Sequence, residues 1–142
     1  MSATFTATTS LELSTPPTRV WAALTDPAMI RQYMFGAELT GDWRQGGTVT
    51  YRGEWDGTPF EDKGDILEID PPRLLKVNYY SAMSGQPDTP ENRQLITYAL
   101  VPSGTGTRLT VSQSNNPTQQ ASTAAEGNWA MTLDALKGLL SP

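Results

Sequence analysis

The stretch TAAEGNWAMTLDALKGLL, residues 123–140, decides the fold, because it is the one segment long and periodic enough to predict a long helix. Four large apolar residues in it follow the i, i+4, i+7, i+11 spacing of a single helix face: Trp129, Leu133, Leu136 and Leu140. That apolar stripe must be buried against the rest of the chain. We therefore expect strands to form a curved sheet around this helix, with room for an internal cavity.

The residues before this helix predict strands and two short helices. A capping residue followed by proline is typical of a helix start, and it occurs as Thr15-Pro16 and Asp26-Pro27. The second of these helices should run through Tyr33. Apolar alternation with a period of two predicts seven strands: 5–13, 37–43, 48–55, 60–69, 73–80, 93–101 and 107–114. The order is β-α-α-β-β-β-β-β-β-α, an α+β fold with consecutive antiparallel strands.

The same alternation predicts which side of each strand is buried. The expected inward residues of the last three strands are Leu75, Val77 and Tyr79, then Ile96, Tyr98 and Leu100, then Leu109 and Val111. Within 60–69, Gly64 interrupts the alternation and predicts a β-bulge at that position.

Length and charge restrict the class of protein. A chain of 142 residues is the size of one domain, which buries roughly two-thirds of its unfolded surface. Its formal charge of −5 opposes binding to phosphate backbones and to anionic membrane surfaces. No segment has the ~20 apolar residues of a membrane span, and the N-terminus lacks a secretory pattern. We expect a cytoplasmic protein with no nucleic-acid partner and no membrane insertion.

Two residue types are missing from the sequence, which contains neither histidine nor cysteine. Without histidine the chain has no Ser-His-Asp or Cys-His catalysis and no ordinary zinc site. Without cysteine it has no disulfide and no thiol chemistry. We expect no metal and no cofactor, and we assign no catalytic residue from the sequence.

Several motifs together point to a known family. They are VWAALTDP at 20–27, the glycine pair at 46–47, Gly64 followed by LEIDPPRL at 67–74, GTRLT at 106–110, and the closing helix entered at Trp129. Together they resemble the Hsp90-ATPase-activator-homologue-like branch of the START/Bet v 1-like (SRPBCC) helix-grip superfamily, over almost the whole chain. The resemblance implies that residues 1–142 form a single START/Bet v 1-like domain with a cavity between sheet and helix.

The implied cavity gives the large apolar and aromatic residues a second interpretation besides plain core. The candidate ligand-binding residues on the elements expected to surround it are Met34, Phe35, Trp43, Tyr51, Trp55, Tyr79, Tyr98, Trp129 and Leu133. Four acidic residues near one turn, Glu54, Asp56, Glu61 and Asp62, have two interpretations of their own. They could be paired carboxylates or cation ligands, but we interpret them as a solvated hairpin tip.

The first functional hypothesis is binding of a small hydrophobic or aromatic ligand between the sheet and the C-terminal helix. The alternative is a cyclase- or dehydratase-like enzyme, whose acid or base would come from Glu54, Tyr51, Tyr79 or Tyr98. A third is an Hsp90-type co-chaperone or other protein-interaction module, and a homodimer is also left open. The resemblance implies that chaperone activators carry an additional N-terminal domain that this sequence lacks. This counts against an Hsp90 role, and a chaperone partner is left open as a weakly supported alternative.

Overall fold

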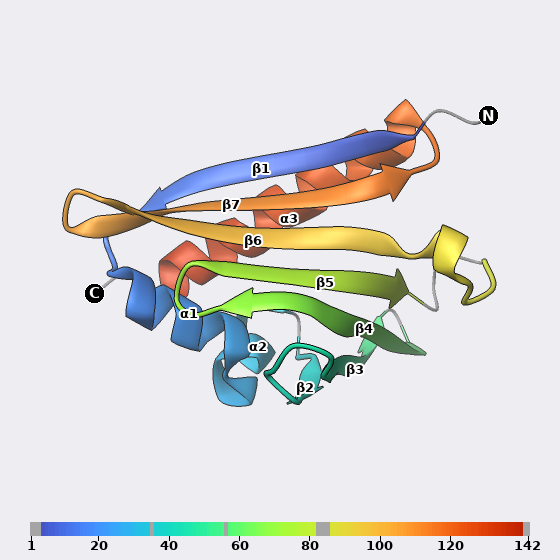
Figure 1. Cartoon of the computed structure of the whole chain (residues 1–142), viewed down its shortest axis with the longest axis horizontal. Helices are drawn as coiled ribbons and strands as arrows, with labels where there is room; N and C mark the ends of the chain where they lie inside the picture. Colours follow the sequence, from blue (N-terminus) through green and yellow to red (C-terminus); the bar gives the residue numbers. More distant parts are fainter. Residues whose placement is uncertain (1–3, 35, 56, 82–85, 141–142) are drawn as a thin grey trace.

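In the computed structural model an antiparallel sheet of seven strands curves around one long helix (Figure 1). The structure describes residues 4–34, 36–55, 57–81 and 86–140, and of Trp55 it describes the backbone only. The strand order is β1-β7-β6-β5-β4-β3-β2. The strands are β1 Phe5–Leu13, β2 Glu38–Gly41, β3 Thr48–Trp55, β4 Thr58–Asp70, β5 Leu74–Ser81, β6 Gln94–Ser103 and β7 Gly106–Asn116. The helices are α1 Pro17–Thr25, α2 Pro27–Tyr33, the 3₁₀ turn η2 Pro90–Asn92, and α3 Gln119–Leu140. The predicted fold class and element order are confirmed.

The long helix α3 begins four residues before the predicted position. Thr118 explains the earlier start, because its hydroxyl accepts a hydrogen bond from the Ala121 amide at 3.0 Å and its carbonyl accepts one from Ser122 at 3.1 Å. This is the geometry of a threonine N-cap, which satisfies amides that otherwise lack partners. Neither α3 nor any other described helix combines the length and apolarity needed to cross a membrane.

Of the two helix caps predicted from the sequence, one is present and the other is not. Asp26 caps α2 as expected, accepting from the Ala28 amide at 3.0 Å. The prediction for Thr15 is wrong, because α1 begins after Pro16 without a side-chain cap. The Thr15 hydroxyl instead donates to the Leu140 carbonyl at 3.4 Å, and the Thr107 hydroxyl donates to the Thr15 carbonyl at 2.7 Å. Thr15 therefore joins the end of β1 to β7 and to the last turn of α3.

The bulge predicted at Gly64 lies further along β4. The pairing of β4 with β5 shifts register between Ile66 and Glu68, and Leu67 is turned outward with 48% of its surface exposed. Gly64 is regularly paired with Val49 and Tyr79 on its two sides. A Cβ at Gly64 would lie 2.3 Å from Val77 Cγ1, so this glycine allows a close approach of the two strands.

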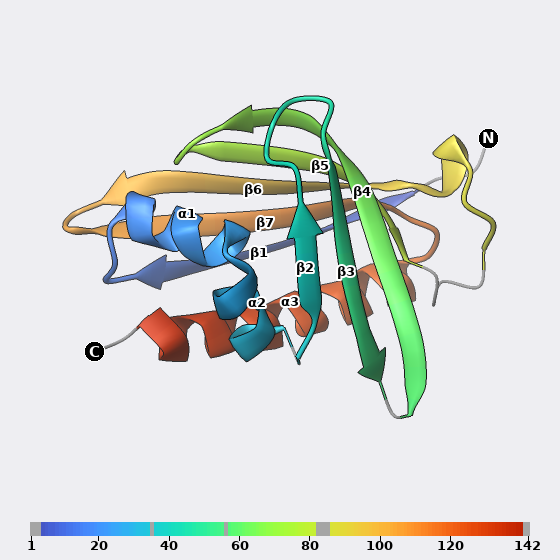
Figure 2. The ribbon, with the colours of Figure 1, turned by 90° about the horizontal axis from the view of Figure 1, so that it is seen from below.

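The core lies between the concave face of the sheet and α3 (Figure 2). The predicted inward residues of β6 and β7 are buried together, with Tyr98 opposite Val111 and Leu100 opposite Leu109. Helix α2 packs against α3, and α1 packs against α2 and against β6 and β7, so that the two short helices close this end of the sheet. The other end is bordered by the bent strands β3 and β4.

Candidate functional site

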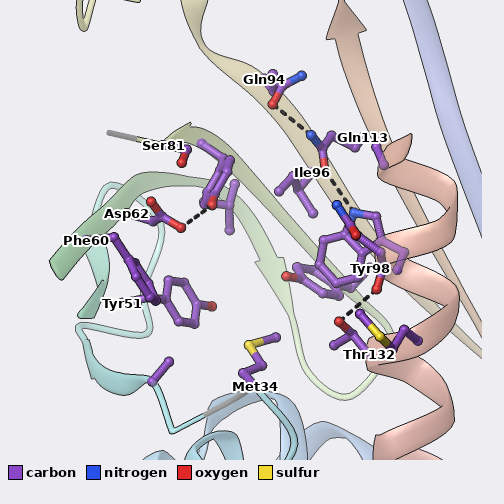
Figure 3. Close-up of a pocket in the computed structure, with 17 residues that line it drawn as sticks. Met34, Tyr51, Phe60, Asp62, Ser81, Gln94, Ile96, Tyr98, Gln113 and Thr132 are labelled. Carbon is purple, nitrogen blue, oxygen red and sulfur yellow. Dashed lines mark hydrogen bonds between the residues drawn. The ribbon is translucent and has the colours of Figure 1, made fainter. Parts of the chain in front are cut away.

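A pocket of about 490 Å³ lies between the concave face of the sheet and residues 125–132 of α3 (Figure 3). Five strands, β3 to β7, contribute inward-facing side chains to its wall, and α3 supplies the opposite side. The aromatic residues of the wall are Tyr51, Phe60, Tyr79, Tyr98 and Trp129. The aliphatic and thioether residues are Met34, Ala37, Val77, Ile96, Ala125 and Met131. The volume and the largely apolar wall fall within the range of small-molecule sites.

The aromatic rings are positioned by strand alternation and by one helix contact. Val77 and Tyr79 on β5 face the same side as Ile96 and Tyr98 on β6, because alternate residues of a strand share a face. The rings of Tyr98 and Trp129 meet edge to face, with centroids 5.8 Å apart and planes at 84°. This geometry is favourable for aromatic pairs, and it fixes α3 against β6 at the pocket.

The structure brings together five of the nine residues predicted for the site: Met34, Tyr51, Tyr79, Tyr98 and Trp129. Leu133 does not line the pocket, because it faces the closed core and is 2% exposed. Trp43 lies beyond the end of β2, where its ring covers Gly41 and packs on the outer part of the core. Phe35 and the side chain of Trp55 lie outside the described residues.

Burial changes the acidity of the pocket tyrosines. Burial raises the pKa of Tyr51 to about 12; a hydrogen bond with Tyr98 opposes the rise and the charge of Asp62 adds to it. Burial is also the main cause that raises the pKa of Tyr79 and of Tyr98 well above the ordinary tyrosine value. A buried phenol resists losing its proton because the anion would be poorly solvated. At neutral pH these groups are therefore uncharged hydroxyls.

Asp62 is a candidate site residue that the sequence does not predict. The sequence places Asp62 at a solvated hairpin tip, but its side chain faces the pocket, where Oδ2 accepts a hydrogen bond from the Tyr79 hydroxyl at 2.5 Å. Its second oxygen, Oδ1, is buried and accepts no hydrogen bond from any described residue. The signal was available in the alternation, since Asp62 shares its strand face with Phe60 and Ile66.

The other acidic residues of that turn do not join Asp62. Glu61 points to the outer face and pairs with Arg52 at 2.6 Å, and Glu54 is exposed. Asp56 lies outside the described residues. Within the described parts of the chain no three acidic side chains gather closely enough to hold a metal ion. The candidate catalytic carboxylate Glu54 is likewise absent from the described wall of the pocket.

A line of amide side chains crosses the far side of the pocket. The Trp129 indole N–H donates to Gln113 Oε1 at 2.8 Å, and Gln113 Nε2 donates to Gln94 Oε1 at 2.7 Å (Figure 3). Gln94 Nε2 then donates to Asn116 Oδ1 at 2.8 Å. Each carbonyl oxygen in this line accepts from the preceding group, so the line has one direction. It holds Trp129 against the sheet and engages polar groups that face the pocket.

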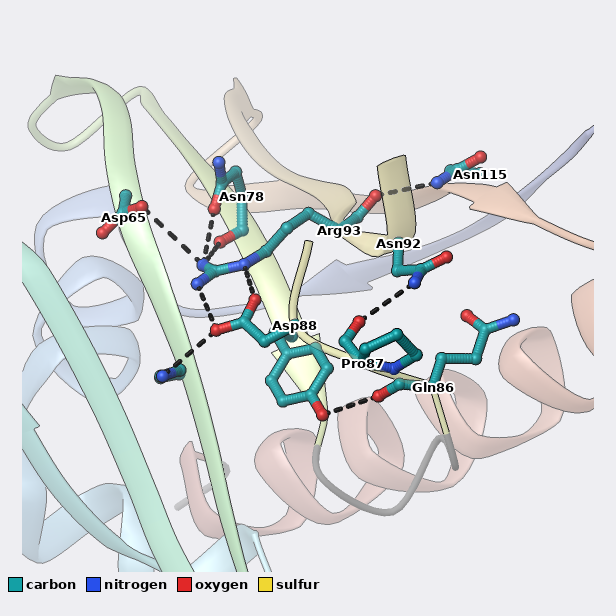
Figure 4. A network of polar contacts seen from close by, with 10 residues as sticks. Asp65, Asn78, Gln86, Pro87, Asp88, Asn92, Arg93 and Asn115 are labelled. Atoms are coloured by element: carbon teal, nitrogen blue, oxygen red, sulfur yellow. Dashed lines mark hydrogen bonds and ion pairs between the residues drawn. The ribbon is translucent and has the colours of Figure 1, made fainter. Parts of the chain in front are cut away.

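Outside the pocket, charged side chains around Arg93 and Asp88 form a network of ion pairs and hydrogen bonds (Figure 4). Arg93 donates to both oxygens of Asp88, at 2.7 and 3.0 Å, and to the Asn78 side-chain oxygen at 2.8 Å. Lys63 approaches Asp88 at 3.1 Å. Hydrogen bonding to Arg93 is the largest cause that lowers the pKa of Asp88. This network joins the segment before β6 to β4 and β5.

The comparisons with known proteins agree with the fold. The family model described as Activator of Hsp90 ATPase homolog 1-like protein matches residues 14–141. The solution structure of ChR145 from Cytophaga hutchinsonii is 34% identical, with a TM-score of 0.85 over 99% of this chain and 96% of that chain. CalU16 from Micromonospora echinospora is 26% identical, with a TM-score of 0.74 over 99% and 88%. The Aha1 dimer from Colwellia psychrerythraea, 16% identical with a TM-score of 0.75 over 96% of both chains, shares the fold. No curated protein matches the chain.

Proposed function

The chain belongs to the Activator of Hsp90 ATPase homolog 1-like family, and from this premise we propose that it binds a small hydrophobic or aromatic molecule in the pocket between the sheet and α3. The observation that carries the proposal is the composition of the pocket wall. Aromatic and aliphatic side chains from four strands and one helix converge there, with a few polar groups fixed among them. A concave, largely apolar surface with sparse, oriented polar groups is typical of small-molecule sites.

Burial of apolar surface supplies the expected affinity. At ~25 cal/mol per Å², a ligand that buries on the order of 500 Å² of apolar surface gains ~12 kcal/mol. Immobilisation at the low estimate of ~4 kcal/mol leaves ~8 kcal/mol, which corresponds to a micromolar dissociation constant. None of the ten Lys and Arg residues lines the described pocket. We therefore expect binding to depend little on salt concentration.

The test is a screen of fatty acids, flavonoids, sterols and polyketide-like aromatics by calorimetry and tryptophan fluorescence. Trp129 lines the pocket and Trp43 does not, which provides a matched pair. Binding should change the fluorescence of the wild type and of Trp43→Phe, and most of that change should disappear in Trp129→Phe. The proposal is overturned if no class of compound binds, or if the signal is lost in Trp43→Phe and kept in Trp129→Phe.

A second candidate function, acid–base catalysis on the bound molecule, is favoured by one observation. Asp62 and Tyr79 form a carboxylate–phenol pair inside the pocket, which offers a proton acceptor and a donor without histidine. This replaces the exposed Glu54 that the sequence suggested. The check is mass spectrometry of a bound compound over time, with wild type and Asp62→Asn. Conversion by the wild type alone would support catalysis, and recovery of the unchanged compound would contradict it.

Binding to Hsp90 and formation of a homodimer are two separate proposals. The family description refers to activation of the Hsp90 ATPase, and the Colwellia psychrerythraea Aha1 structure is described as a dimer. For this chain, stimulation of a purified Hsp90 ATPase and sedimentation velocity test the two ideas directly. An active co-chaperone would raise the ATPase rate in proportion to its binding, and a homodimer would sediment at twice the mass of the chain.

A further inference from the structure

We propose that the ligand of this pocket carries a hydrogen-bond donor, a hydroxyl or a protonated amine, which binds the carboxylate of Asp62. The inference rests on the proposed function and names the chemical class of its ligand. Asp62 has one oxygen engaged by Tyr79 and a second that is buried without a partner among the described residues. A buried acceptor without a donor is costly, so native structures pair nearly all of them. A donor on the ligand would complete the pair.

The position of Asp62 suits this role. In the sheet it pairs with Tyr51 of β3 on one side and Ser81 of β5 on the other, and both of these residues also line the pocket. Asp62 therefore lies within the wall rather than at a loose end of the chain. Its Tyr79 partner fixes the carboxylate from one side. A group held by its neighbours in this way is preorganised for an incoming donor.

Two donors of the wall are already engaged by acceptors within the protein. The Trp129 N–H is engaged by Gln113, and the Tyr79 hydroxyl is engaged by Asp62. No lysine or arginine lines the described pocket, so a ligand carboxylate would meet Asp62 without a compensating cation. An aromatic body that ends in a hydroxyl or ammonium group therefore fits better than a fatty-acid-like anion.

The first experiment uses four probes with one aromatic body: naphthol, naphthylmethylamine, methoxynaphthalene and naphthoate. Binding is measured by calorimetry and by the Trp129 signal. Naphthol or the amine should bind the wild type about tenfold or more tightly than methoxynaphthalene, the scale of one hydrogen bond to a charged group. Naphthoate should bind most weakly. A stronger preference for the amine identifies a cationic ligand, and one for naphthol a neutral hydroxyl.

Variants locate the preference. Asp62→Leu should bind naphthol and methoxynaphthalene about equally, and Asp62→Asn should lose the preference for the amine. Glu61→Gln removes the same charge from the neighbouring residue on the outer face, and it should keep the wild-type preference. Equal binding of naphthol and methoxynaphthalene to the wild type would overturn the inference while leaving the proposed function standing. A preference that survives in Asp62→Leu would also overturn it. Failure of all four probes to bind, together with failure of every compound class in the wider screen, would overturn both.

Discussion

The two ends of α3 face the same sheet but have different neighbours. At the closed end, Leu133, Leu136 and Leu140 pack against the sheet and are 6% exposed or less. At the pocket end, residues 125–132 present Ala125, Asn128 and Thr132 together with the Trp129 ring. The apolar stripe of the helix is continuous in sequence, yet only one half of it is fully enclosed.

The difference comes from the two short helices and from side-chain size. Val20, Ala23 and Ile30 of α1 and α2 are fully buried, and they fill the space beside the closed end of α3. At the pocket end the helix offers a small side chain, Ala125, where a leucine would reach into the pocket. A pocket therefore remains where neither a short helix nor a large side chain from α3 occupies the space. The comparison predicts that the two ends respond differently to the same kind of substitution.

The largest effect is expected at Leu136. Leu136→Ala removes a side chain that is fully buried in the closed end, and it should lower the free energy of unfolding by about 2–5 kcal/mol. The matched variant is Met131→Ala on the same helix, which lines the pocket and is 50% exposed. It should cost less than about 1 kcal/mol, because little new cavity forms. Denaturant midpoints at constant slope measure both, and equal losses would contradict the distinction between the two ends.

A pair of enlarged alanines gives the next effect. Ala23→Leu adds bulk to α1 in the closed core and should destabilise by about 1–3 kcal/mol. Ala125→Leu adds the same bulk to α3 at the pocket, where the side chain has space, and should change stability by less than about 1 kcal/mol. The same variant should weaken binding of naphthalene-sized probes. Thermal unfolding and calorimetry test this, and a loss at Ala125 as large as at Ala23 would show a filled site.

The sequence predicted the closed end of α3 better than the pocket end. Periodicity assigns a residue to a face, so Leu136 and the inward residues of β5 to β7 were placed correctly. It does not say how far along the helix the enclosing elements reach. For that reason the sequence predicts Leu133 for the site although it faces closed core, and Trp43 although it lies beyond the end of β2.

The polar part of the site was harder to predict because composition and alternation disagreed. Asp62 follows Glu61 near a turn, which is typical of a solvated tip, whereas its strand parity places it inward. Gly64 shows a similar ambiguity, since a glycine within a strand is typical of a bulge or of a close approach. Only the packing of Val77 against it decides between the two. Asp62 is hydrogen-bonded to Tyr79, and Gln94 to Gln113. In each pair the two residues come from different strands, and no local sequence pattern joins them.

A third comparison uses one tyrosine from each end. The Tyr33 hydroxyl donates to the Ala23 carbonyl at 2.7 Å, and the usual helical donor to that carbonyl would be residue 27, a proline without an N–H. Tyr33→Phe should therefore cost about 1–2 kcal/mol, because it leaves a buried acceptor unpaired. Tyr51→Phe at the pocket end should cost less at neutral pH. Chemical denaturation at pH 7 measures both variants, and a larger loss for Tyr51→Phe would reverse the comparison.

The smallest effect is expected in alkaline solution, where Tyr51 reports on the pocket end. Its pKa is raised by burial from the ordinary value of 10.0 to about 12 in the folded protein. The folded state therefore favours the protonated phenol, and this contribution to stability is complete below pH 10 and is lost as the pH rises towards 12. Between pH 10 and 11 the loss for one such group is about 1 kcal/mol. Tyr51→Phe should remove that part of the decline, so its free energy of unfolding should fall less steeply than that of the wild type over this interval. Urea denaturation at intervals of pH measures the two slopes. Parallel slopes would mean that the Tyr51 hydroxyl is as well solvated in the folded chain as in the unfolded one, and that the pocket end is open to water at this ring.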